Sequence, residues 1–121
     1  MAAYLEGRHH PHLALEPRTV WIAESGVNII GYVGGHLTRR FDCDGELQYL
    51  YVAPPYRRTG VAGALVRLLA QWFVEQGAHR ICVNVNAHSP GAHPFYRHLG
   101  AEELRQHWMV WQDIATVMAK S

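Results

Sequence analysis

A chain of 121 residues has the length of one domain rather than two. Hydrophobic residues make up 49% of the chain and charged residues 17%, which excludes a disordered, charge-rich polypeptide. The 11 Lys and Arg residues against 10 Asp and Glu residues leave a net charge of +1, so there is no general attraction for nucleic acid. A domain that binds nucleic acid through Arg39-Arg40 and Arg57-Arg58 is therefore a disfavoured alternative.

The sequence indicates a cytoplasmic protein with neither a membrane span nor a signal peptide. Polar residues such as Arg67 and Gln71 interrupt the apolar runs, and no basic head precedes an apolar run at the N-terminus. Of the two cysteines, Cys82 lies in an apolar run, as a buried thiol does. The histidines at 9, 10 and 12 lack the further ligands of a tetrahedral site, so no metal is predicted. Residues 1–17 are interpreted as a short leader to a single domain that spans residues 1–121.

Three strands are predicted before the longest helix. Thr19–Ala23 is rich in β-branched and aromatic residues, and Ser25-Gly26 supplies a turn. Asn28–Val33 then completes a hairpin, which Gly34-Gly35 ends or bulges. The third strand, Glu46–Val52, alternates at first and then becomes continuously apolar.

The clearest helix is predicted to begin just after Gly60 and to end before Gly77. Its apolar residues recur three and four positions apart, so they form one stripe along the helix. Arg80–Val85 then predicts a central strand and Gly91–His98 a short helix, and a final hairpin lies within Glu103–Trp111. The strand–helix–strand order predicts one parallel pair in an otherwise antiparallel sheet, which is a mixed α/β fold.

The segment between the third strand and the long helix has the chemistry of an anion site. The first amides of a helix have no helical partner, and the helix dipole places partial positive charge there. Gly60 and Gly63 keep side chains away from this backbone, and Arg57 and Arg58 add positive charge. A turn with two surface arginines is the alternative for this stretch taken alone.

The run from Leu50 to Ala62 resembles the acetyl-CoA site of the GCN5-related N-acetyltransferases. The signature of that superfamily, Gln/Arg-x-x-Gly-x-Gly/Ala, is matched by Arg57, Gly60 and Ala62. Ser89–Ala101 is similar to a second segment of the family, so the resemblance covers about half of the chain. It implies a mixed, mostly antiparallel sheet with a splayed parallel pair, flanking helices and an abbreviated N-terminus.

The resemblance also implies the co-substrate and the residues that hold it. Acetyl-CoA would run beside the backbone of the third strand, with its pyrophosphate on the amides of the following loop and helix. No metal is implied. The cofactor-binding residues that the resemblance implies are Leu50, Tyr51, Val52, Arg57, Arg58, Thr59, Gly60, Val61, Ala62, Gly63, Asn86 and Ser89.

The same resemblance gives two candidates for catalysis, and the position after the glycine pair gives a third, His36. Tyr96 would be the general acid that protonates the departing thiolate, and its alternative is a ring packed against the sheet with a solvated hydroxyl. Glu46 is the first candidate for the general base, and its alternative is an exposed glutamate at a strand end. His36 is a second candidate base. Pro94 removes an amide donor inside the short helix, so that helix is expected to start later or to bend.

The function implied is acetyl transfer from acetyl-CoA to a primary amine, by direct attack in a ternary complex. The alternative is a module of the same fold that binds CoA or acyl-CoA without catalysis. The amine is a small molecule or a peptide whose identity the sequence leaves open. The region before the first hairpin is short compared with the family, so either the acceptor pocket is unusually open or a second subunit completes it. The second alternative leads us to expect a homodimer. Trp108 and Trp111 are its candidate interface residues, with core packing as their alternative.

Overall fold

The computed structural model of the protein describes residues 2–4, 14–85 and 91–119. Within these residues, seven strands form one sheet in the order β1-β2-β3-β4-β5-β7-β6. The strands are β1 (Ala2–Tyr4), β2 (Ala14–Ser25), β3 (Asn28–Thr38), β4 (Gly45–Val52), β5 (Ile81–Asn84), β6 (Glu102–Arg105) and β7 (Trp108–Trp111). The helices are α1 (Val61–Glu75), α2 (Ala92–His98) and α3 (Ala115–Met118), with short 3-10 turns η1 (Arg40–Asp42) and η2 (Pro54–Tyr56).

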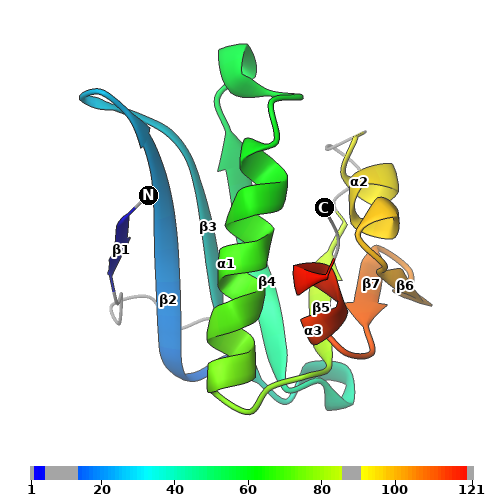
Figure 1. Cartoon of the computed structure of the whole chain (residues 1–121). Helices are drawn as coiled ribbons and strands as arrows, with labels where there is room; N and C mark the ends of the chain where they lie inside the picture. The colour runs from blue at the N-terminus through cyan, green and yellow to red at the C-terminus, as the bar shows by residue number, and fades with distance from the viewer. Residues whose placement is uncertain (1, 5–13, 86–90, 120–121) are drawn as a thin grey trace.

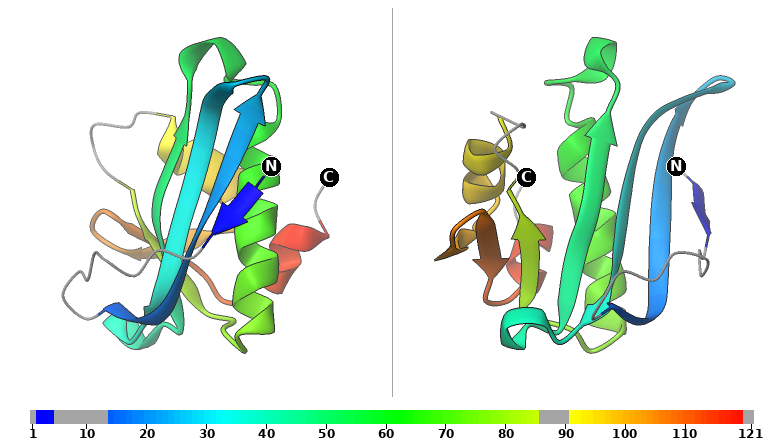
Figure 2. Two further views of the ribbon diagram at one scale, coloured as in Figure 1. Left: turned by 90° about the vertical axis from the view of Figure 1, so that its left-hand side faces the viewer. Right: turned by 180° about the vertical axis from the view of Figure 1, so that it is seen from behind.

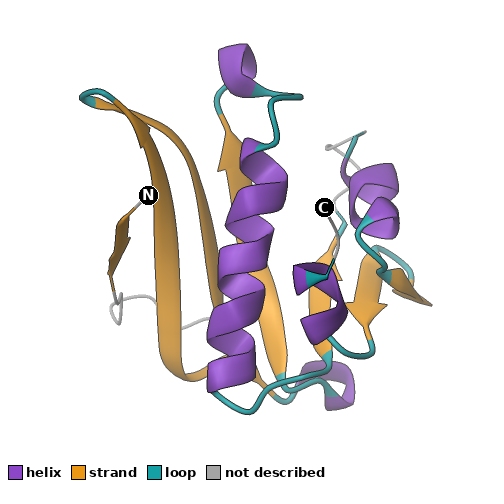
Figure 3. Cartoon of the chain, in the orientation of Figure 1, coloured by secondary structure: helices purple, strands orange, loops and turns teal. Residues whose placement is uncertain are grey.

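The sheet carries its helices unequally on its two faces. Helix α1 lies across one face and contacts β2, β3 and β4, with α3 beside it (Figures 1 and 3). Seen from behind, the same three strands lie in front of α1, and no described helix covers that side (Figure 2). Among the described strands, only β4 and β5 pair in parallel, and the other pairs are antiparallel. The predicted fold class is confirmed.

The first hairpin is longer than the sequence pattern predicts. Gly26 adopts φ +62 in its turn, a conformation that glycine reaches without a side-chain clash. Strand β2 is longer at both ends than the predicted strand Thr19–Ala23. The glycine pair Gly34-Gly35 lies inside β3 rather than at its end. Glycine has a low propensity for β-strands, so the pairing of Gly34 and Gly35 with both β2 and β4 is what keeps this backbone in the sheet. Strand β1 and the start of β2 fall within residues 1–17, described above only as a leader.

A bulge changes the direction of the side chains along β4. Gly34 pairs with Tyr49 and Gly35 with Leu47, so Gln48 has no partner in β3. The glycine pair therefore marks the bulge, which is one of its two predicted effects. Leu47 packs in the core beneath α1, whereas Tyr49 lies over Gly34 on the uncovered face.

Helix α1 approaches the sheet closely because glycines face it. A Cβ atom on Gly35 would lie 2.9 Å from Leu69 and 3.0 Å from Phe73, and Gly45 would meet Phe73 at 2.5 Å. The apolar stripe of α1 is buried as predicted, and the chain leaves the helix through Gly77, whose φ is +77. The core is thus centred between α1 and the middle strands.

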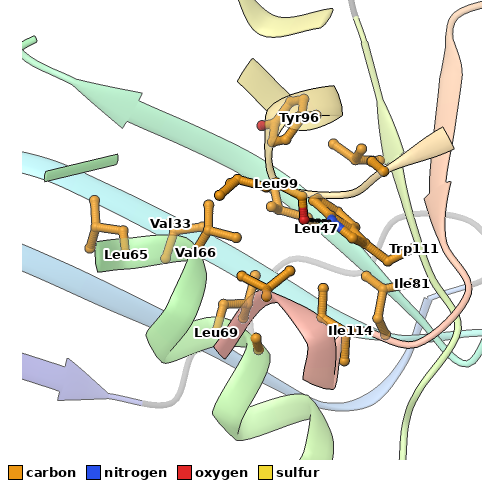
Figure 4. Packing of buried hydrophobic residues seen from close by; sticks show 14 of the residues in the cluster. Val33, Leu47, Leu65, Val66, Leu69, Ile81, Tyr96, Leu99, Trp111 and Ile114 are labelled. Carbon is orange, nitrogen blue, oxygen red and sulfur yellow. Dashed lines mark hydrogen bonds between the residues drawn. The ribbon is translucent and has the colours of Figure 1, made fainter. Parts of the chain in front are cut away.

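The second half of the chain closes the core from the other side. Trp111 is 1% exposed and donates its Nε1–H to the carbonyl of Leu99 at 3.2 Å, so β7 is fastened to the end of α2 (Figure 4). Pro94 stands in the first turn of α2, where its missing amide has no helical acceptor to lose, so the helix begins at Ala92. Helix α3 is missed by the sequence pattern because it has only four residues. None of the described helices has the length and hydropathy needed to cross a bilayer.

Candidate active site

A groove opens where β4 and β5 part. The two strands pair only from Gly45 to Leu47 and from Ile81 to Val83. Beyond Leu47, β4 continues to Val52 with β3 as its described strand partner, so its other edge is open to an extended ligand. The groove has a volume of about 440 Å³. It is lined by Leu47–Val52, Arg57, Ala62, Val83, Asn84, Gly91, Ala92, Phe95 and Tyr96.

The loop after β4 folds back on the end of that strand. Arg57 donates its Nε–H to the carbonyl of Val52 at 2.9 Å, and the hydroxyl of Thr59 donates to the carbonyl of Tyr56. Two prolines in η2 restrict the backbone between these contacts. The loop therefore holds Arg57 in the wall of the groove and delivers the chain to the start of α1.

The N-terminus of α1 is not capped by a side chain. Gly60 precedes it in the left-handed region at φ +89, and Arg58 adopts φ +64 two residues earlier. The amides of Val61, Ala62 and Gly63 belong to the first turn, where no helical acceptor is available. No atom lies within 4 Å of the position that a Cβ on Gly60 would occupy. These amides and the helix dipole fit a bound diphosphate.

Tyr96 lies in the wall of the groove opposite β4, on α2. Its ring makes edge contacts with Phe95 at 5.2 Å and with Trp111 at 5.6 Å between centroids. Its hydroxyl oxygen lies on the side of the ring away from Trp111 (Figure 4). The residue is 6% exposed, and this burial raises the pKa of its phenol above the usual value of 10.0. The phenol is therefore a neutral hydrogen-bond donor at physiological pH.

Glu46 and His36 pair across β3 and β4 on the face away from α1. Arg40 donates its Nε–H to Glu46 Oε1 at 3.1 Å, and His36 Nε2 lies 3.8 Å from the same oxygen. His36 Nδ1–H donates to the carbonyl of Leu37 at 2.8 Å, and burial lowers the pKa of His36, so the ring is neutral at pH 7. Glu46 is buried, so the alternative of an exposed strand-end glutamate is wrong. Neither residue is among those that line the groove, and the structure thus separates the candidate bases from Tyr96.

The remaining predicted residues have different placements. Leu50, Tyr51 and Val52 line the groove, whereas Asn86 and Ser89 lie outside the described residues. Trp111 is buried in the core, so its proposed role in a subunit interface is wrong and the core-packing alternative is confirmed. Trp108 packs on the ring of Phe41 at 5.0 Å and beneath Arg40.

The histidines at positions 9, 10 and 12 lie outside the described residues. Within the described part of the chain, no group of three or more His, Cys, Asp or Glu side chains gathers as metal ligands. Cys43 and Cys82 are free thiols, both buried in one small cluster with Val110, which agrees with the interpretation of Cys82 as a buried thiol.

The sequence analysis did not assign eight of the groove-lining residues to the site: Leu47, Gln48, Tyr49, Val83, Asn84, Gly91, Ala92 and Phe95. Gln48 and Tyr49 line the groove because the bulge turns them there, and Phe95 comes from α2 beside Tyr96. A signal for Phe95 was present, since it immediately precedes the predicted acid on a predicted helix. The bulge has no comparable local signal, because it is a property of the pairing between β3 and β4.

Comparison with known proteins agrees with this geometry. A family profile described as the acetyltransferase (GNAT) family matches residues 2–101. An uncharacterised N-acetyltransferase of Mycobacterium tuberculosis is 35% identical over 83 residues, which are 69% of this chain and 52% of that protein. N-acetyltransferase 8B of Rattus norvegicus is 31% identical over 98 residues, covering 76% of this chain and 44% of that protein. The chain thus spans about half the length of the curated relatives it matches.

Solved structures share the fold. An aminoglycoside N-acetyltransferase in complex with CoA superposes with a TM-score of 0.68 at 21% identity. The match covers 75% of this chain and 72% of that one. At this level of identity the likeness concerns the architecture of the sheet and its helices.

Proposed function

The chain belongs to the acetyltransferase (GNAT) family, and from this membership we propose that it transfers an acetyl group from acetyl-CoA to a primary amine. The observation that carries the proposal is the groove between β4 and β5, which has the uncapped start of α1 beside it and Tyr96 in its wall. Acetyl-CoA supplies a thioester whose acyl carbon accepts an amine directly. The new C–N bond replaces the C–S bond, and the amine loses a proton while the thiolate gains one.

The groove and the following loop supply complementary contacts for the co-substrate. We assign the pantetheine arm to the open edge of β4 at Leu50, Tyr51 and Val52, where an extended amide chain can bond to the backbone. The diphosphate is assigned to the segment Arg58–Gly63, with Arg57 in the wall of the groove. Asn86 and Ser89 stay in the proposal as implied contacts.

Tyr96 is assigned the role of general acid. An alkyl thiolate leaves more readily when a donor protonates it, and a thiol has a pKa near 8.5 if cysteine is a guide. Because burial raises the pKa of Tyr96, the phenol is protonated when the C–S bond breaks and can donate a hydrogen bond to the departing sulfur. The thiolate is a weaker base than the phenolate, so the proton is proposed to pass to sulfur as solvent at the open end of the groove resupplies the phenol.

Glu46 is retained as the proposed general base. An amine attacks only as the neutral species, and a lysine-like amine has a reference pKa of about 10.4, so a proton must be removed. Glu46 precedes the groove-lining Leu47 on β4, on the face of the sheet that α1 leaves uncovered. Its carboxylate lies outside the groove lining, so the proton is proposed to travel through water.

The test is release of free thiol from acetyl-CoA across classes of amine, with Tyr96→Phe beside the wild type. We expect the variant to lose kcat by about 10²-fold, because general acid catalysis contributes that order of acceleration. Its affinity for acetyl-CoA should be retained, since the ring and its packing remain.

Equal kcat in both proteins would remove Tyr96 from the mechanism. Protection of the protein by acetyl-CoA against heat, without thiol release from any amine, would instead favour the non-catalytic CoA-binding module.

A further inference from the structure

A second cavity lies on the face of the sheet away from α1. It has a volume of about 580 Å³ and is lined by Val20, Ile22, Ile29, Tyr32 and Tyr49. Strands β2, β3 and β4 supply these residues, and no described helix covers them (Figure 2). A volume of this size is typical of sites that take a small organic molecule.

The cavity and the groove share a wall. Tyr49 lines both of them. Tyr32 contacts Tyr49 edge to face at 5.6 Å and stacks on Tyr51 at 5.3 Å, and Tyr51 lines the groove. Three exposed phenol rings therefore form a continuous strip from the cavity to the groove. A molecule lying on this strip would have one end in the cavity and the other at the edge of β4 that is assigned to the pantetheine arm.

Gly34 is what allows Tyr49 to lie in this position. A Cβ on Gly34 would meet Tyr49 Cζ at 2.3 Å and its hydroxyl oxygen at 2.6 Å. The ring thus lies directly over the backbone of β3, where any other residue would displace it. The bulge at Gln48 turns Tyr49 to this face, so two separate features of the ladder produce one arrangement.

The lining favours one class of amine. Among the described residues that line the cavity there are three aliphatic side chains and two phenols, and no carboxylate. The carboxylate of Glu46, which lies on the same face of the sheet, is bound by Arg40. A polycation would therefore bring charges into the cavity that none of the described lining residues neutralises, and their desolvation would be unfavourable. An apolar body buries its surface there, and a single amino group can lie beside the ring faces.

We propose that the acceptor is a monoamine with an aromatic or aliphatic body, which binds in this cavity with its amino group directed along Tyr49 toward the groove. The inference rests on the proposed acetyl transfer and adds the substrate class to it. It excludes polyamines and aminoglycosides as preferred acceptors of this chain.

The first experiment measures thiol release with 2-phenylethylamine, spermidine and an aminoglycoside at saturating acetyl-CoA. We expect kcat/KM for 2-phenylethylamine to exceed that for either polycation by at least about tenfold, because only its body matches the lining. Preference for a polycation would overturn the inference while leaving acetyl transfer intact.

The second experiment tests the residues. Tyr49→Ser should raise KM for 2-phenylethylamine about tenfold and raise KM for acetyl-CoA by less, because the aromatic contact with the acceptor is lost. Tyr49→Phe should keep the wild-type KM. Val27→Ser is the matched control, since Val27 is 98% exposed in the hairpin turn and lines neither cavity. An unchanged KM in Tyr49→Ser would overturn the inference.

Two further measurements keep the result interpretable. If Tyr49→Ser fails to fold, Gly34→Ala displaces the ring while keeping the tyrosine, and it should raise the same KM.

Calorimetric titration of 2-phenylethylamine into the CoA-saturated protein reports binding without turnover. Binding that Tyr49→Ser weakens would support the cavity even if no amine releases thiol, whereas no binding would overturn it. A dimer that Tyr49→Ser dissociates, with KM unchanged, would identify the face as a subunit interface and also overturn the inference.

Discussion

Tyr96 and Glu46 are both buried, but Tyr96 has aromatic neighbours whereas Glu46 has an arginine beside its carboxylate. Tyr96 has aromatic neighbours, so its neutral form is favoured and its pKa rises. Glu46 has Arg40 at 3.1 Å, which stabilises a carboxylate. A neutral donor and a charged acceptor are what an acid and a base require before acetyl transfer begins. Phe95 is adjacent to Tyr96 in the sequence, whereas the fold brings Trp111 to Tyr96 and Arg40 to Glu46.

Glu46→Gln tests the proposed base. The glutamine side chain has the size of glutamate and keeps one acceptor oxygen for Arg40, but its amide group cannot take a proton. We therefore expect kcat to fall by about 10²-fold with little change in the melting temperature. The measurement is kcat from pH 6 to 9 beside thermal unfolding of the same variant.

His36→Gln is the companion variant, because His36 is the second candidate base and neighbours the same oxygen. A lower melting temperature in Glu46→Gln with unchanged kcat would assign Glu46 to the support of Arg40 instead. A loss of kcat confined to His36→Gln would transfer the role to the histidine.

The start of α1 is the element on which co-substrate binding depends. Gly60 holds φ +89, and an alanine there is strained by about 1 kcal/mol or more even though space for its methyl exists. We expect Gly60→Ala to weaken CoA binding, because the loop would shift to relieve the strain and take the first amides with it. Denaturant unfolding and CoA titration measure the two effects.

Gly63→Ala adds a methyl group to the same proposed diphosphate segment at a position without a positive φ. Gly63 lies inside the helix, and its added methyl would contact only the flexible end of Arg67 at 3.4 Å. Because alanine favours a helix over glycine, this variant should be more stable by up to about 1 kcal/mol. If both alanines weaken CoA binding equally, the effect of Gly60 is steric rather than conformational.

The parallel pair of strands is clamped at its start by one carboxylate. Asp44 accepts the amides of Arg80 at 3.0 Å and His79 at 2.9 Å, and its own amide donates to the carbonyl of Arg80. The hydrogen bond from the Arg80 amide, followed by that from His79, lowers the pKa of Asp44 below its ordinary value of 3.8. This clamp fixes the end of the β4–β5 ladder opposite to the groove.

Asp44→Ala should lower the melting temperature at neutral pH and change its pH dependence. A carboxyl whose pKa is lower in the folded state stabilises that state above the unfolded pKa, and the stabilisation is lost as pH falls through the folded pKa. The difference between wild type and variant should therefore be constant from pH 5 to 7 and shrink below about pH 4. Melting curves between pH 2.5 and 7 test this, with Glu24→Ala as the exposed control. A difference that is independent of pH would contradict the role of the charge.

At the scale of the molecule, the sheet consists of two parts joined by a short seam. Strands β1 to β4 lie on one side and β5 to β7 on the other, with three residue pairs of β4 and β5 between them. Helix α1 packs on the first part, and α3 contacts α1 from the second. A co-substrate in the groove would contact both parts beyond the seam.

We therefore expect CoA to stabilise the whole protein. A ligand at 100 times its dissociation constant adds about 2.7 kcal/mol to the free energy of unfolding when it binds only the native state. Hydrogen exchange should slow in the backbone of Gln48–Val52 and in the first turn of α1, while the tip of the β2–β3 hairpin serves as the internal control. Protection confined to that hairpin would place the ligand elsewhere.

The sequence by itself determined the elements whose cause is local. The apolar stripe of α1, the stop at Gly77 and the strand–helix–strand order each follow from residues a few positions apart, and the structure confirms them. The glycine and arginine pattern after β4 predicted an anion-binding helix start on the same basis. Amides of a first turn lack partners in any helix, so this inference needed no tertiary contact.

Only the tertiary structure decided how those elements meet. The bulge at Gln48 sets which face Tyr49 occupies, and Gly34 provides the space for its ring. The same ladder buries Glu46 beside His36 and leaves both outside the groove lining. Strand register, burial and pKa all arise from contacts between residues far apart in the chain, whereas sequence spacing reports only on neighbours.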